Sequence, residues 1–494
     1  MKAKSVIVIG AGIGGITAAA HLARSGSHVT VLEKNAHPGG RCDRFSREGH
    51  HFDTGPTLFV MPLLYAAEFQ TLGTSLHDRL DLQRVDPTYH LVFDNGSQLA
   101  LTSDMKSMQE QLETIQPGSF QGLLRYLQEG ERHYQFTIDK LVNRDFRKAS
   151  DFFNLQNLPL LFRLKPLTNH YRNMSAYFDA PHLKSAFTFQ DIYMGLSPFE
   201  APATFSMMPY TELAHGVWYP KGGMYSIVET LTDLARQAGV EFSFSTAVER
   251  IDANANHARG VRLADGTRLE ADVLLANADL PYVYQNLLPQ DGMAKALAHK
   301  RFSCSVISFF WGMDKTFPVL DPHTLFLADD YRENFESIDR DLSLPANPSL
   351  YLHAPTRLDP SMAPPGQDTL TAIVPVGHMS DNGGQDWGEL RELARQHVFR
   401  RLRTLGITDF EAHIKFEETY TPISWAKRYN LVKGSTHGLS HKLTQMAYFR
   451  PSNRHPHYQN LYFVGASTHP GTGMPTAMVS GRLVAQRIRD ELYG

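Results

Sequence analysis

The stretch VIVIGAGIGGITAAAHLARSGSHVTVLEK, Val6–Lys34, decides the fold of this 494-residue chain. It opens with a β-branched run typical of a buried parallel strand, and a G-x-G-x-x-G motif follows directly from Gly10. An apolar helical face then extends to Gly26, which the pattern places just past the helix end, and a second strand over 28–32 ends at Glu33. This order of strand, glycine turn, helix, strand and acid predicts a dinucleotide-binding βαβ unit.

Each residue of the motif has a physical task in binding a dinucleotide. Gly10 permits a tight turn, Gly12 lets the backbone approach a pyrophosphate, and Gly15 allows the helix to pack closely. The helix N-terminus favours an anion. Glu33, 18 residues past Gly15, is placed to accept a hydrogen bond from a ribose hydroxyl. The alternative is a glycine-rich turn in an unrelated α/β unit.

Two further segments bear on whether the nucleotide is a flavin. In Pro38–Arg41 the paired glycines would let the chain pass close to a pyrophosphate or flavin, and Arg41 would neutralise phosphate charge. On its own this segment is equally typical of a turn with a solvated arginine. Near the end of the chain, NLYFVGASTHPGTGMPTAMVSGRLVAQRI predicts a strand over 461–464, a loop from Gly465 and a helix from about Pro475. The N-terminus of that helix would stabilise reduced flavin, and the helix would also pack on the sheet.

These motifs together resemble the bacterial and fungal type of phytoene desaturase, the carotenoid desaturase family of FAD-dependent oxidoreductases. The resemblance runs nearly end to end and rests on VIVIGAGIGGITAAAHLARSG, LEKNAHPGGR, HHFDTGPTLFVMP, GVWYPKGGMYSIVETL, SLYLHAPTRLDPSMAPPG and LYFVGASTHPGTGMP. The first two are shared by many flavoproteins, whereas GVWYPKGG and GASTHPGTGMP are much more specific. The resemblance implies an α/β, Rossmann-like glutathione-reductase-type FAD-binding fold with an inserted α+β substrate and membrane-associated domain.

The resemblance also implies which residues bind the cofactor. It places Thr57 and its two predecessors by the isoalloxazine, Val248 at the adenine through its backbone, and Met474 beside the flavin ring. The full set is Gly10, Gly12, Gly14, Gly15, Glu33, Lys34, Gly40, Arg41, Gly55, Pro56, Thr57, Val248, Gly465, Gly473 and Met474. The family often reads G-A-G-T-H-P-G where this chain has Ser467 at the third position, a small change that is compatible with cofactor binding.

The predicted FAD-binding domain is discontinuous in sequence. Its second piece carries a predicted strand over 240–244 and the buried strand DVLLANA. We expect the FAD-binding domain to comprise residues 1–79, 215–285 and 451–494, and the substrate-binding and membrane-associated domain to comprise residues 80–214 and 286–450.

Composition argues against several other functions. The formal net charge is −3, and no block of Lys and Arg is long enough to make nucleic acid the main partner. Cys42 and Cys304 form no C-x-x-C pair and the 23 histidines are scattered, so neither a disulfide scaffold nor a metal site is predicted. No signal peptide is predicted, and no apolar run approaches the ~18 residues that span a bilayer. We therefore expect a cytoplasmic protein whose membrane contact is peripheral.

One segment has the composition of a membrane-facing surface. Residues 155–178, LQNLPLLFRLKPLTNHYRNMSAYF, contain no acidic residue and interleave apolar side chains with Arg and Lys. This pattern suits the surface of an anionic bilayer, from which a lipophilic substrate would be taken up. Pro159 and Pro166 divide the segment into short pieces. A core-facing segment with solvated basic residues explains the charges equally well, and the family resemblance favours peripheral association with the cytoplasmic membrane.

Desaturation requires a dry site that also contains a base. Two hydrogens leave adjacent carbons, most simply as a hydride to flavin N5 and a proton from the neighbouring carbon, and an allylic hydride donor becomes a cation that water would attack. Spacing does not decide which residue takes the proton, so the catalytic residue is left open. The candidate bases are Asp191, Glu200, Glu212, His215 and His469, of which His469 is favoured because it lies in the flavin-side loop.

The route of the electrons and the shape of the substrate tunnel are less constrained by the sequence. No second G-x-G-x-x-G follows a later strand, which argues against a dedicated NAD(P)H site. The resemblance implies that reduced FAD passes its electrons to oxygen or to a membrane quinone. SCSVISFFWGMDK, residues 303–315, predicts a strand whose aromatics either line an apolar tunnel or, as is more frequent, belong to the core.

The leading hypothesis is a peripheral membrane FAD enzyme that dehydrogenates a carotenoid such as phytoene. A related desaturase or isomerase acting on a hydroxycarotenoid or a diapocarotenoid would show the same motifs, because only the tunnel differs. An amine oxidase would share the N-terminal half of the pattern and lack GASTHPGTGMP. An isoprenoid escort protein of the same fold is disfavoured, because a chain without flavin has no reason to keep the pyrophosphate site open.

Overall fold

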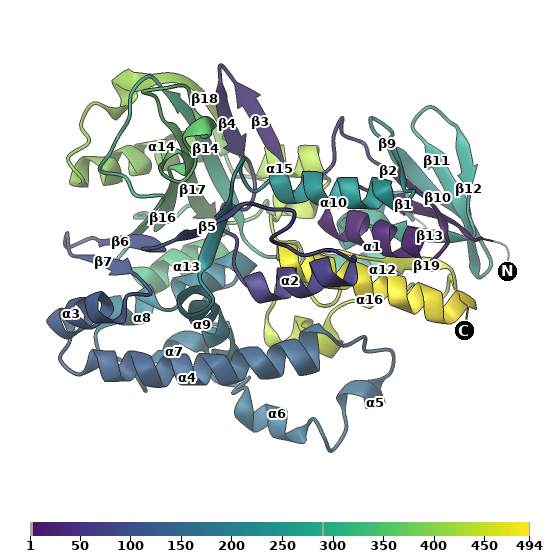
Figure 1. The fold of residues 1–494 in the computed structure, drawn as a ribbon, viewed down its shortest axis with the longest axis horizontal. Helices are drawn as coiled ribbons and strands as arrows, with labels where there is room; N and C mark the ends of the chain where they lie inside the picture. Colours follow the sequence, from purple (N-terminus) through teal and green to yellow (C-terminus); the bar gives the residue numbers. More distant parts are fainter. Residues whose placement is uncertain (1–2, 289–290, 494) are drawn as a thin grey trace.

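The computed structural model describes residues 3–288 and 291–493, and within them a parallel sheet forms one end of the molecule (Figure 1). The strands predicted over 28–32, 240–244 and 461–464 are confirmed, with ends that differ by at most one residue. The order across the sheet is β19 (Leu461–Phe463), β13 (Val273–Ala276), β1 (Ser5–Ile9), β2 (His28–Leu32) and β9 (Glu241–Ser243).

Alternate residues of β1 pack on opposite faces of this sheet. The packing elements are α1 (Ile13–Arg24), α10 (Ser226–Gln237) and α16 (Met474–Tyr493) on one face and β10 (Val248–Asn254), β11 (His257–Leu263) and β12 (Arg268–Glu270) on the other. Val6 and Val8 share a buried cluster with the three helices, whereas Ile7 and Ile9 pack with the antiparallel sheet β10-β11-β12. Burial on both faces explains the unbroken apolar run in the sequence.

The last helix, α16, packs directly on α1 because small residues meet there. A Cβ atom on Gly481 would lie 2.6 Å from the carbonyl oxygen of Gly14 and 2.9 Å from the backbone nitrogen of Ala18. The predicted packing of this helix on the sheet is therefore confirmed. The helix begins at Met474, one residue before the predicted start.

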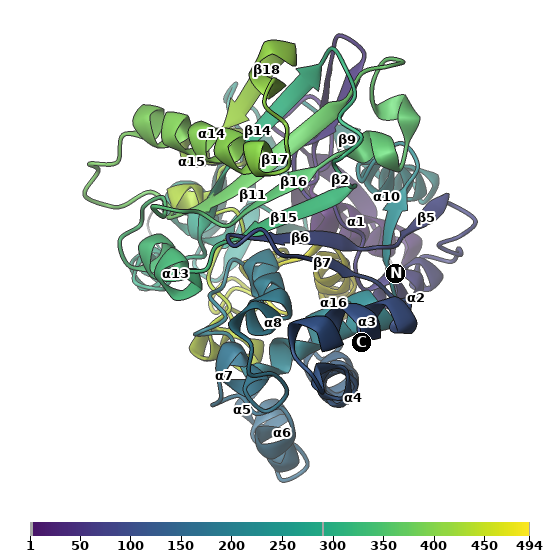
Figure 2. The same cartoon turned by 90° about the vertical axis from the view of Figure 1, so that its left-hand side faces the viewer.

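A second large sheet stands beside the first, and it has seven strands within the described residues (Figure 2). All neighbours are antiparallel except β15 and β6, which are parallel. The order is β18 (Ile414–Tyr420), β14 (Ser305–Met313), β17 (Thr369–Val376), β16 (Leu350–His353), β15 (His323–Leu327), β6 (Tyr89–Phe93) and β7 (Gln98–Leu101).

Strand β14 places its two faces in different surroundings. Phe309 and Trp311 stack with ring centroids 5.3 Å apart and pack in the core beneath α14 (Trp387–Thr404). Val306 and Ser308 point the other way and line the cavity described below. The prediction that these aromatics could line a tunnel is therefore wrong, and the core alternative is correct.

Helices from the first half of the chain form a layer beneath the seven-stranded sheet (Figure 1). They are α3 (Met105–Ile115), α4 (Ser119–Thr137), α5 (Ala149–Phe152), α6 (Leu158–Arg163), α7 (His170–Met174), α8 (Pro181–Ala186) and α9 (Met207–Ala214). Helix α6 lies at an extremity of the molecule in both views (Figures 1 and 2). The predicted short pieces over 155–178 are confirmed, but Pro159 lies in the first turn of α6 instead of breaking the helix, because the first turn needs no N–H donor.

The remaining elements connect these layers. Two of them are two-stranded sheets: the hairpin of β3 (Arg44–Arg47) and β4 (His50–Asp53), and the pair of β5 (Leu82–Val85) and β8 (Val217–Pro220). The others are the helices α2 (Pro62–Thr71), α11 (Leu280–Tyr282), α12 (Met293–Ala298), α13 (Tyr331–Asp339) and α15 (Pro422–Tyr429). In the part of the chain that the structure describes, no helix combines the length and apolar character needed to cross a bilayer.

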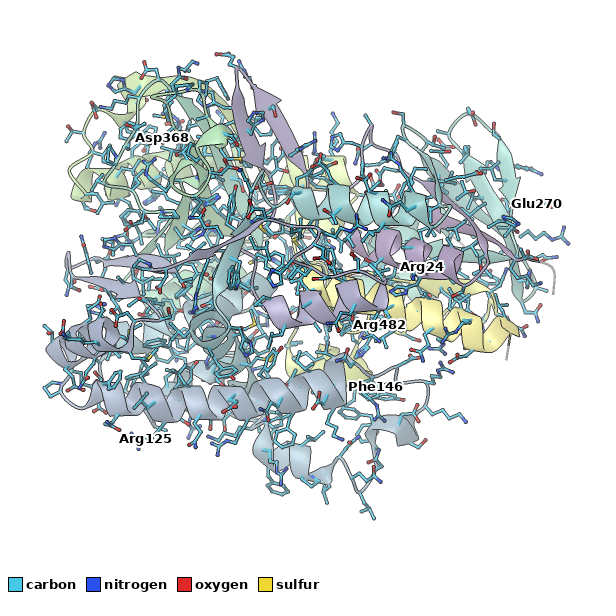
Figure 3. The ribbon with its side chains drawn as sticks, viewed as in Figure 1. Arg24, Arg125, Phe146, Glu270, Asp368 and Arg482 are labelled. Carbon is cyan, nitrogen blue, oxygen red and sulfur yellow. The ribbon has the colours of Figure 1, made fainter. Side chains whose placement is uncertain are left out.

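The lobe of the seven-stranded sheet contains an ion pair between fully buried Asp368 (Figure 3) and partly exposed Arg357, and its loss should destabilise the protein. Arg357 donates from Nη1 and Nη2 to the two carboxylate oxygens of fully buried Asp368, each at 2.8 Å. Asp368→Asn leaves this guanidinium without its counter-charge, so the free energy of unfolding should fall by roughly 3–5 kcal/mol, measured by urea denaturation.

An exposed pair serves as the control for this prediction. Lys106 and Glu110 lie 4.0 Å apart on the surface of α3, and Glu110→Gln should change the free energy of unfolding by less than about 0.5 kcal/mol. Equal losses for the two variants would contradict the role assigned to the buried pair.

Candidate functional site

A cavity of about 1010 Å³ lies between the carboxyl end of the parallel sheet and the seven-stranded sheet. Residues that follow β1, β2 and β19 line one part, and residues of β14, β15, β16 and β17 line another. The carboxyl end of a parallel sheet is where α/β proteins of this kind bind their ligands. Segments far apart in the sequence therefore share one cavity.

The glycine motif forms the wall of the cavity at the start of α1. Gly10, Gly12 and Gly14 line it, whereas Gly15 does not. A Cβ on Gly15 would lie 2.5 Å from the carbonyl oxygen of Gly10, so this glycine permits close packing instead. The first turn of α1 has no acidic residue and no side-chain cap, and its N–H groups favour an anionic ligand.

Asn277 is a site residue that the sequence analysis missed. It follows β13, and its Nδ2 donates to the carbonyl oxygen of Gly10 at 3.1 Å while its own backbone N–H donates to Ile9. It lines the cavity and lies so close to Gly12 that a Cβ there would be 2.8 Å from Asn277 Nδ2. The one available signal was a polar residue at the end of an apolar strand.

Glu33 and its neighbours line the cavity beside the end of β2. The carboxylate of Glu33 is 5% exposed and accepts hydrogen bonds from the N–H groups of Ala11 and Asn35, each at 2.8 Å. Lys34 also lines the cavity, and its Nζ donates to Asn430 Oδ1 at 2.8 Å. Val248, at the start of β10, lies on the same part of the wall. A fixed acceptor in this position suits a ribose hydroxyl.

The turn that follows β2 brings Arg41 to the glycine motif. A Cβ on Gly40 would lie 3.2 Å from the Cα of Gly12, so the two backbones nearly touch. Arg41 lines the cavity and donates from Nη1 to the carbonyl oxygen of Thr436 at 2.9 Å. Burial lowers the pKa of Arg41, and nearby Asp279 opposes that shift. A half-buried guanidinium that faces a cavity next to a helix N-terminus favours a phosphate-bearing ligand.

Gly55 occupies the tightest position in the site. A Cβ there would lie 1.9 Å from the carbonyl oxygen of Arg41, so only glycine fits. Gly55, Pro56 and Thr57 all line the cavity, and Thr57 Oγ1 is hydrogen-bonded to Tyr351 Oη at 2.8 Å. This segment thus connects the turn at Arg41 to the seven-stranded sheet.

Asp53 joins two of the sequence motifs at this point. Its buried carboxylate accepts hydrogen bonds from the N–H groups of Met224 (2.8 Å) and Tyr225 (3.1 Å). Burial raises the pKa of Asp53 to about 6, against the lowering effect of these backbone donors. A Cβ on Gly223 would lie 2.8 Å from Asp53 Oδ2, so the segments HHFDTGP and YPKGGMYS pack directly against each other.

The loop after β19 closes the cavity from the other side. Gly465, Gly473 and Met474 line it, and Met474 begins α16. Ser467, where the family pattern often has glycine, donates to Asp279 Oδ1 at 2.7 Å and accepts from the N–H of Leu439 at 3.2 Å. Its hydroxyl therefore fixes the loop without entering the cavity.

None of the five candidate bases lines the cavity in the part of the chain that the structure describes. His469, the favoured candidate, packs against Phe146 with ring centroids 5.2 Å apart, and burial lowers its pKa to about 4 (Figure 3). Its position in the loop was predicted correctly, but its ring faces the protein interior. We therefore expect it to be neutral and structural.

The other candidates have different partners. Glu200 pairs with Arg301 at 2.8 Å near the surface, Asp191 is buried against His170 at 3.0 Å, and the ring of His215 lies between two tyrosines. Glu212 is buried and reaches the cavity wall only through tyrosines. Sequence position did not reveal these surroundings, because most of the partners lie on distant elements.

The part of the cavity beside the seven-stranded sheet is apolar. Its wall combines residues from β15, β17 and α13 with residues from α9 and from the 3₁₀ helix Phe189–Met194. Representative lining residues are Ile192, Met194, Met208, Leu325, Phe335 and Ile373. Such a wall suits a hydrocarbon ligand.

Known proteins resemble this chain over almost its whole length. The family model described as flavin containing amine oxidoreductase matches residues 13–489. The chain is 41% identical over 507 residues to the phytoene desaturase of Fusarium fujikuroi, covering 98% of this chain and 89% of that protein. It is 40% identical over 489 residues to the zeta-carotene-forming phytoene desaturase of Myxococcus xanthus, with coverage of 99% and 94%.

A more distant relative and a solved structure extend this comparison. The 4,4'-diapophytoene desaturase (4,4'-diaponeurosporene-forming) of Staphylococcus haemolyticus is 32% identical over 501 residues, covering 99% of each chain. A putrescine oxidase bound to putrescine has a TM-score of 0.66 at 14% identity and 99% coverage of each chain. The last likeness shows the fold alone, which is an α/β fold of the flavin amine oxidase type.

Gly55→Ala should abolish or severely reduce the retention of flavin. The added methyl cannot fit 1.9 Å from the carbonyl oxygen of Arg41, so the backbone of Arg41 must move away from the glycine motif. We expect purified Gly55→Ala to be folded by circular dichroism and largely colourless, as measured by flavin absorbance per protein.

Gly292→Ala is the matched control. A Cβ on Gly292 would meet no atom of the described residues within 4 Å, and the φ of −65° at this position is accessible to alanine. This variant should keep the flavin content of the unmodified protein. If Gly55→Ala kept it as well, the close approach seen at Arg41 would not govern cofactor binding.

Proposed function

Because the chain belongs to the phytoene desaturase family of flavin-containing amine oxidoreductases, we propose that it is an FAD-dependent carotenoid desaturase that acts on phytoene. The single observation that carries this proposal is the continuity of the cavity. One part is lined by the glycine motif and Arg41, and the other by apolar residues of the seven-stranded sheet. A flavin and a hydrocarbon can therefore meet without water between them.

The residues of the first part fit FAD in particular. The N–H groups at Gly12 and the guanidinium of Arg41 would bind the diphosphate, and Glu33 would accept from the ribose. The cavity continues to Val248, which leaves room for an adenine beyond the ribose. Gly55–Thr57 and Met474 would flank the isoalloxazine at the junction with the apolar part.

The second part fits a polyene. When bound, the flavin supplies a two-electron acceptor that takes a hydride. The chain's own residues orient the hydrocarbon and exclude water, so that a cationic carbon formed by hydride loss is not hydrated. Ile373 and Leu325 on the sheet and Met208 on α9 provide this dry surface.

The two proposed binding functions, for FAD and for substrate, correspond to the two large sheets. We assign FAD binding to residues 1–79, 215–285 and 451–494, because these stretches supply every strand of the parallel sheet. We assign substrate binding to residues 80–214 and 286–450, because they supply the seven-stranded sheet and the helices beneath it. The substrate-binding stretches interrupt the FAD-binding ones and so form an insertion in the Rossmann-like fold.

We further propose that the protein binds the cytoplasmic membrane peripherally through the surface around α6. Five apolar side chains are each more than half exposed there: Phe153, Leu155, Leu158, Phe162 and Leu167. Arg163 and Arg172 are exposed beside them. Val142, which ends the π-helix Ile138–Val142 just before this surface, lines the cavity. A substrate dissolved in the bilayer would enter here, and a membrane quinone or oxygen would take the electrons.

A shorter carotenoid is a second candidate substrate. The relative from Staphylococcus haemolyticus acts, by its name, on a 4,4'-diapophytoene, and it is 32% identical to this chain. The relatives from Fusarium and Myxococcus are closer at 41% and 40%, which favours phytoene.

Expression in a bacterial strain that accumulates phytoene tests the proposed reaction. The cells should become coloured relative to an empty-vector control, because each new double bond extends the conjugated system. Pigment analysis would identify the product and so count the desaturation steps. Colourless cells that contain soluble, flavin-loaded protein would reject phytoene, and the same experiment with diapophytoene would then follow.

Removing the apolar character of the α6 surface should weaken membrane binding. The double variant Phe162→Ser and Leu167→Ser exposes less apolar area to the bilayer, and the fraction that sediments with anionic vesicles should fall several-fold. The control is the double variant Val319→Ser and Ile423→Ser, which changes two half-exposed apolar residues elsewhere. Equal sedimentation of the two variants would show that the surface around α6 is not the membrane-docking surface.

A further inference from the structure

Glu212 is a buried carboxyl that the cofactor and substrate contacts above do not use. It lies in α9 and is 2% exposed. Its Oε1 accepts from Tyr89 Oη at 3.0 Å, and its Oε2 accepts from Gln190 Nε2 at 3.0 Å. Within the described residues, the side chains that act on it are these two and Tyr193, and none of them is positively charged.

A carboxyl in this environment changes protonation near neutral pH. Burial without a counter-ion disfavours the carboxylate, whereas the three donors favour it. Burial has the larger effect and raises the pKa of Glu212 to about 7. By contrast, Asp191, which is equally buried, has His170 as a partner at 3.0 Å. Glu212 can therefore bind and release a proton at physiological pH.

Tyr193 connects Glu212 to the cavity. Its hydroxyl is hydrogen-bonded to that of Tyr89, which donates to Glu212, and Tyr193 itself lines the cavity. Tyr89 is buried behind it on β6 and does not line the cavity within the described residues. Tyr193 is thus the member of this cluster that a substrate would touch.

The cluster lies close to the cofactor end of the cavity. Gly195, two residues after Tyr193, is so near the loop beside Arg41 that a Cβ on it would lie 2.8 Å from His437 Nδ1. On the other side, Tyr351 acts electrostatically on Tyr193 and is hydrogen-bonded to Thr57. Tyr193 therefore faces the junction where the two parts of the cavity meet.

We propose that Tyr193 accepts the proton that the substrate loses during desaturation and that Glu212 stores it. This inference rests on the proposed function and names the base that the reaction requires. Tyr193 is the catalytic residue of this proposal because it lines the cavity in which the substrate would bind. Glu212 is a positioning residue that acts through Tyr193 and Tyr89.

The step balances in atoms and electrons. When bound, the flavin would accept a hydride and leave an allylic cation on the substrate, and a C–H bond on the adjacent carbon would then break. Its electron pair forms the new double bond, and its proton goes to Tyr193 Oη as the hydroxyl proton of Tyr193 moves along the hydrogen bonds to Glu212. A C–H next to a cationic carbon is strongly acidic, so a neutral tyrosine backed by a carboxylate is a sufficient base.

Glu212 is the side chain of this cluster that titrates near pH 7, because the titratable side chains around it stay neutral. Burial raises the pKa values of Tyr89 on β6, Tyr126 on α4 and Tyr351 on β16, so these tyrosines stay neutral. Burial lowers the pKa of His323 on β15 well below its usual value, so this ring is neutral as well. The rate should therefore rise with pH through about 7, as Glu212 becomes a carboxylate.

The experiment measures the reduction of enzyme-bound flavin by phytoene in vesicles, without oxygen, in a single turnover at several pH values. Tyr193→Phe and Glu212→Gln should each slow reduction by roughly 10²–10⁴-fold at pH 8, with unchanged flavin content. The pH dependence near 7 should vanish in Glu212→Gln. Tyr126→Phe is the control, because Tyr126 is a buried tyrosine bonded to His170 and Phe187 outside the cavity. It should react at the unmodified rate.

A second measurement needs no substrate. Because the pKa of Glu212 is raised on folding, the folded protein binds its proton more tightly, and stability falls as pH rises from about 4.5 to about 7. The Tm of Glu212→Gln relative to the unmodified protein should therefore increase between pH 5 and pH 8. Gln190 Oε1 has no hydrogen-bond partner in the described chain, so its amide can rotate to accept from the amide introduced at position 212.

The outcomes separate the two proposals. Slow reduction in both variants, with the pH dependence lost in Glu212→Gln, supports the proton route. Unmodified rates in Tyr193→Phe and Glu212→Gln overturn it while leaving the desaturase intact. If the unmodified protein is not reduced by phytoene, the proposed function fails and the proton route fails with it. A Tm difference that does not change with pH also overturns the assignment of Glu212.

Discussion

The architecture depends on the close approach of three backbone segments at the carboxyl end of the parallel sheet. A Cβ on Gly15 would lie 2.5 Å from the carbonyl oxygen of Gly10, one on Gly40 would lie 3.2 Å from the Cα of Gly12, and one on Gly55 would lie 1.9 Å from the carbonyl oxygen of Arg41. Because these positions lack side chains, the N-terminus of α1 and the guanidinium of Arg41 face the same space. The anion-binding character of the cavity is thus a consequence of backbone packing.

The seven-stranded sheet forms the other part of the cavity wall, because alternate residues of a strand point to opposite faces of the sheet. Phe309 and Trp311 fill the core beneath α14, and their neighbours Val306 and Ser308 form part of the cavity wall. One strand therefore both stabilises its lobe and shapes the substrate surface. The two halves are linked through Thr57, which follows Gly55 and contacts Tyr351 of β16. This short connection joins the two parts of the cavity that we assign to cofactor and substrate.

Local pattern was sufficient to predict the strand–turn–helix–strand unit that lines one part of the cavity and insufficient for the contacts between distant segments. The βαβ unit, its glycines and Glu33 are contiguous in sequence, so their geometry follows from turn and helix rules. The role of Ser467 and the contribution of Asn277 depend on contacts between distant strands, and no local pattern shows them. The fold class, the strands and the helix from Met474 could therefore be read from the chain.

The catalytic candidates show why the rest could not be predicted. His469 and Glu212 both lie in family-like motifs, yet His469 turns toward Phe146, whereas Glu212 meets tyrosines from β6 and from the 3₁₀ helix Phe189–Met194. Both side chains are buried, so their partners separate them: an aromatic ring lies beside His469, and hydrogen-bond donors surround Glu212. Phe146 and Tyr89 each lie more than a hundred residues along the chain from the side chain that they contact.

An experimental structure of the flavin-loaded protein tests most directly the central claim that one continuous cavity holds FAD and substrate. The account predicts the diphosphate between the N-terminus of α1 and Arg41, with the isoalloxazine beside Gly55–Thr57 and one face open to the apolar part near Tyr193. A flavin bound elsewhere, or one whose ring is separated from the apolar part by protein, would contradict it.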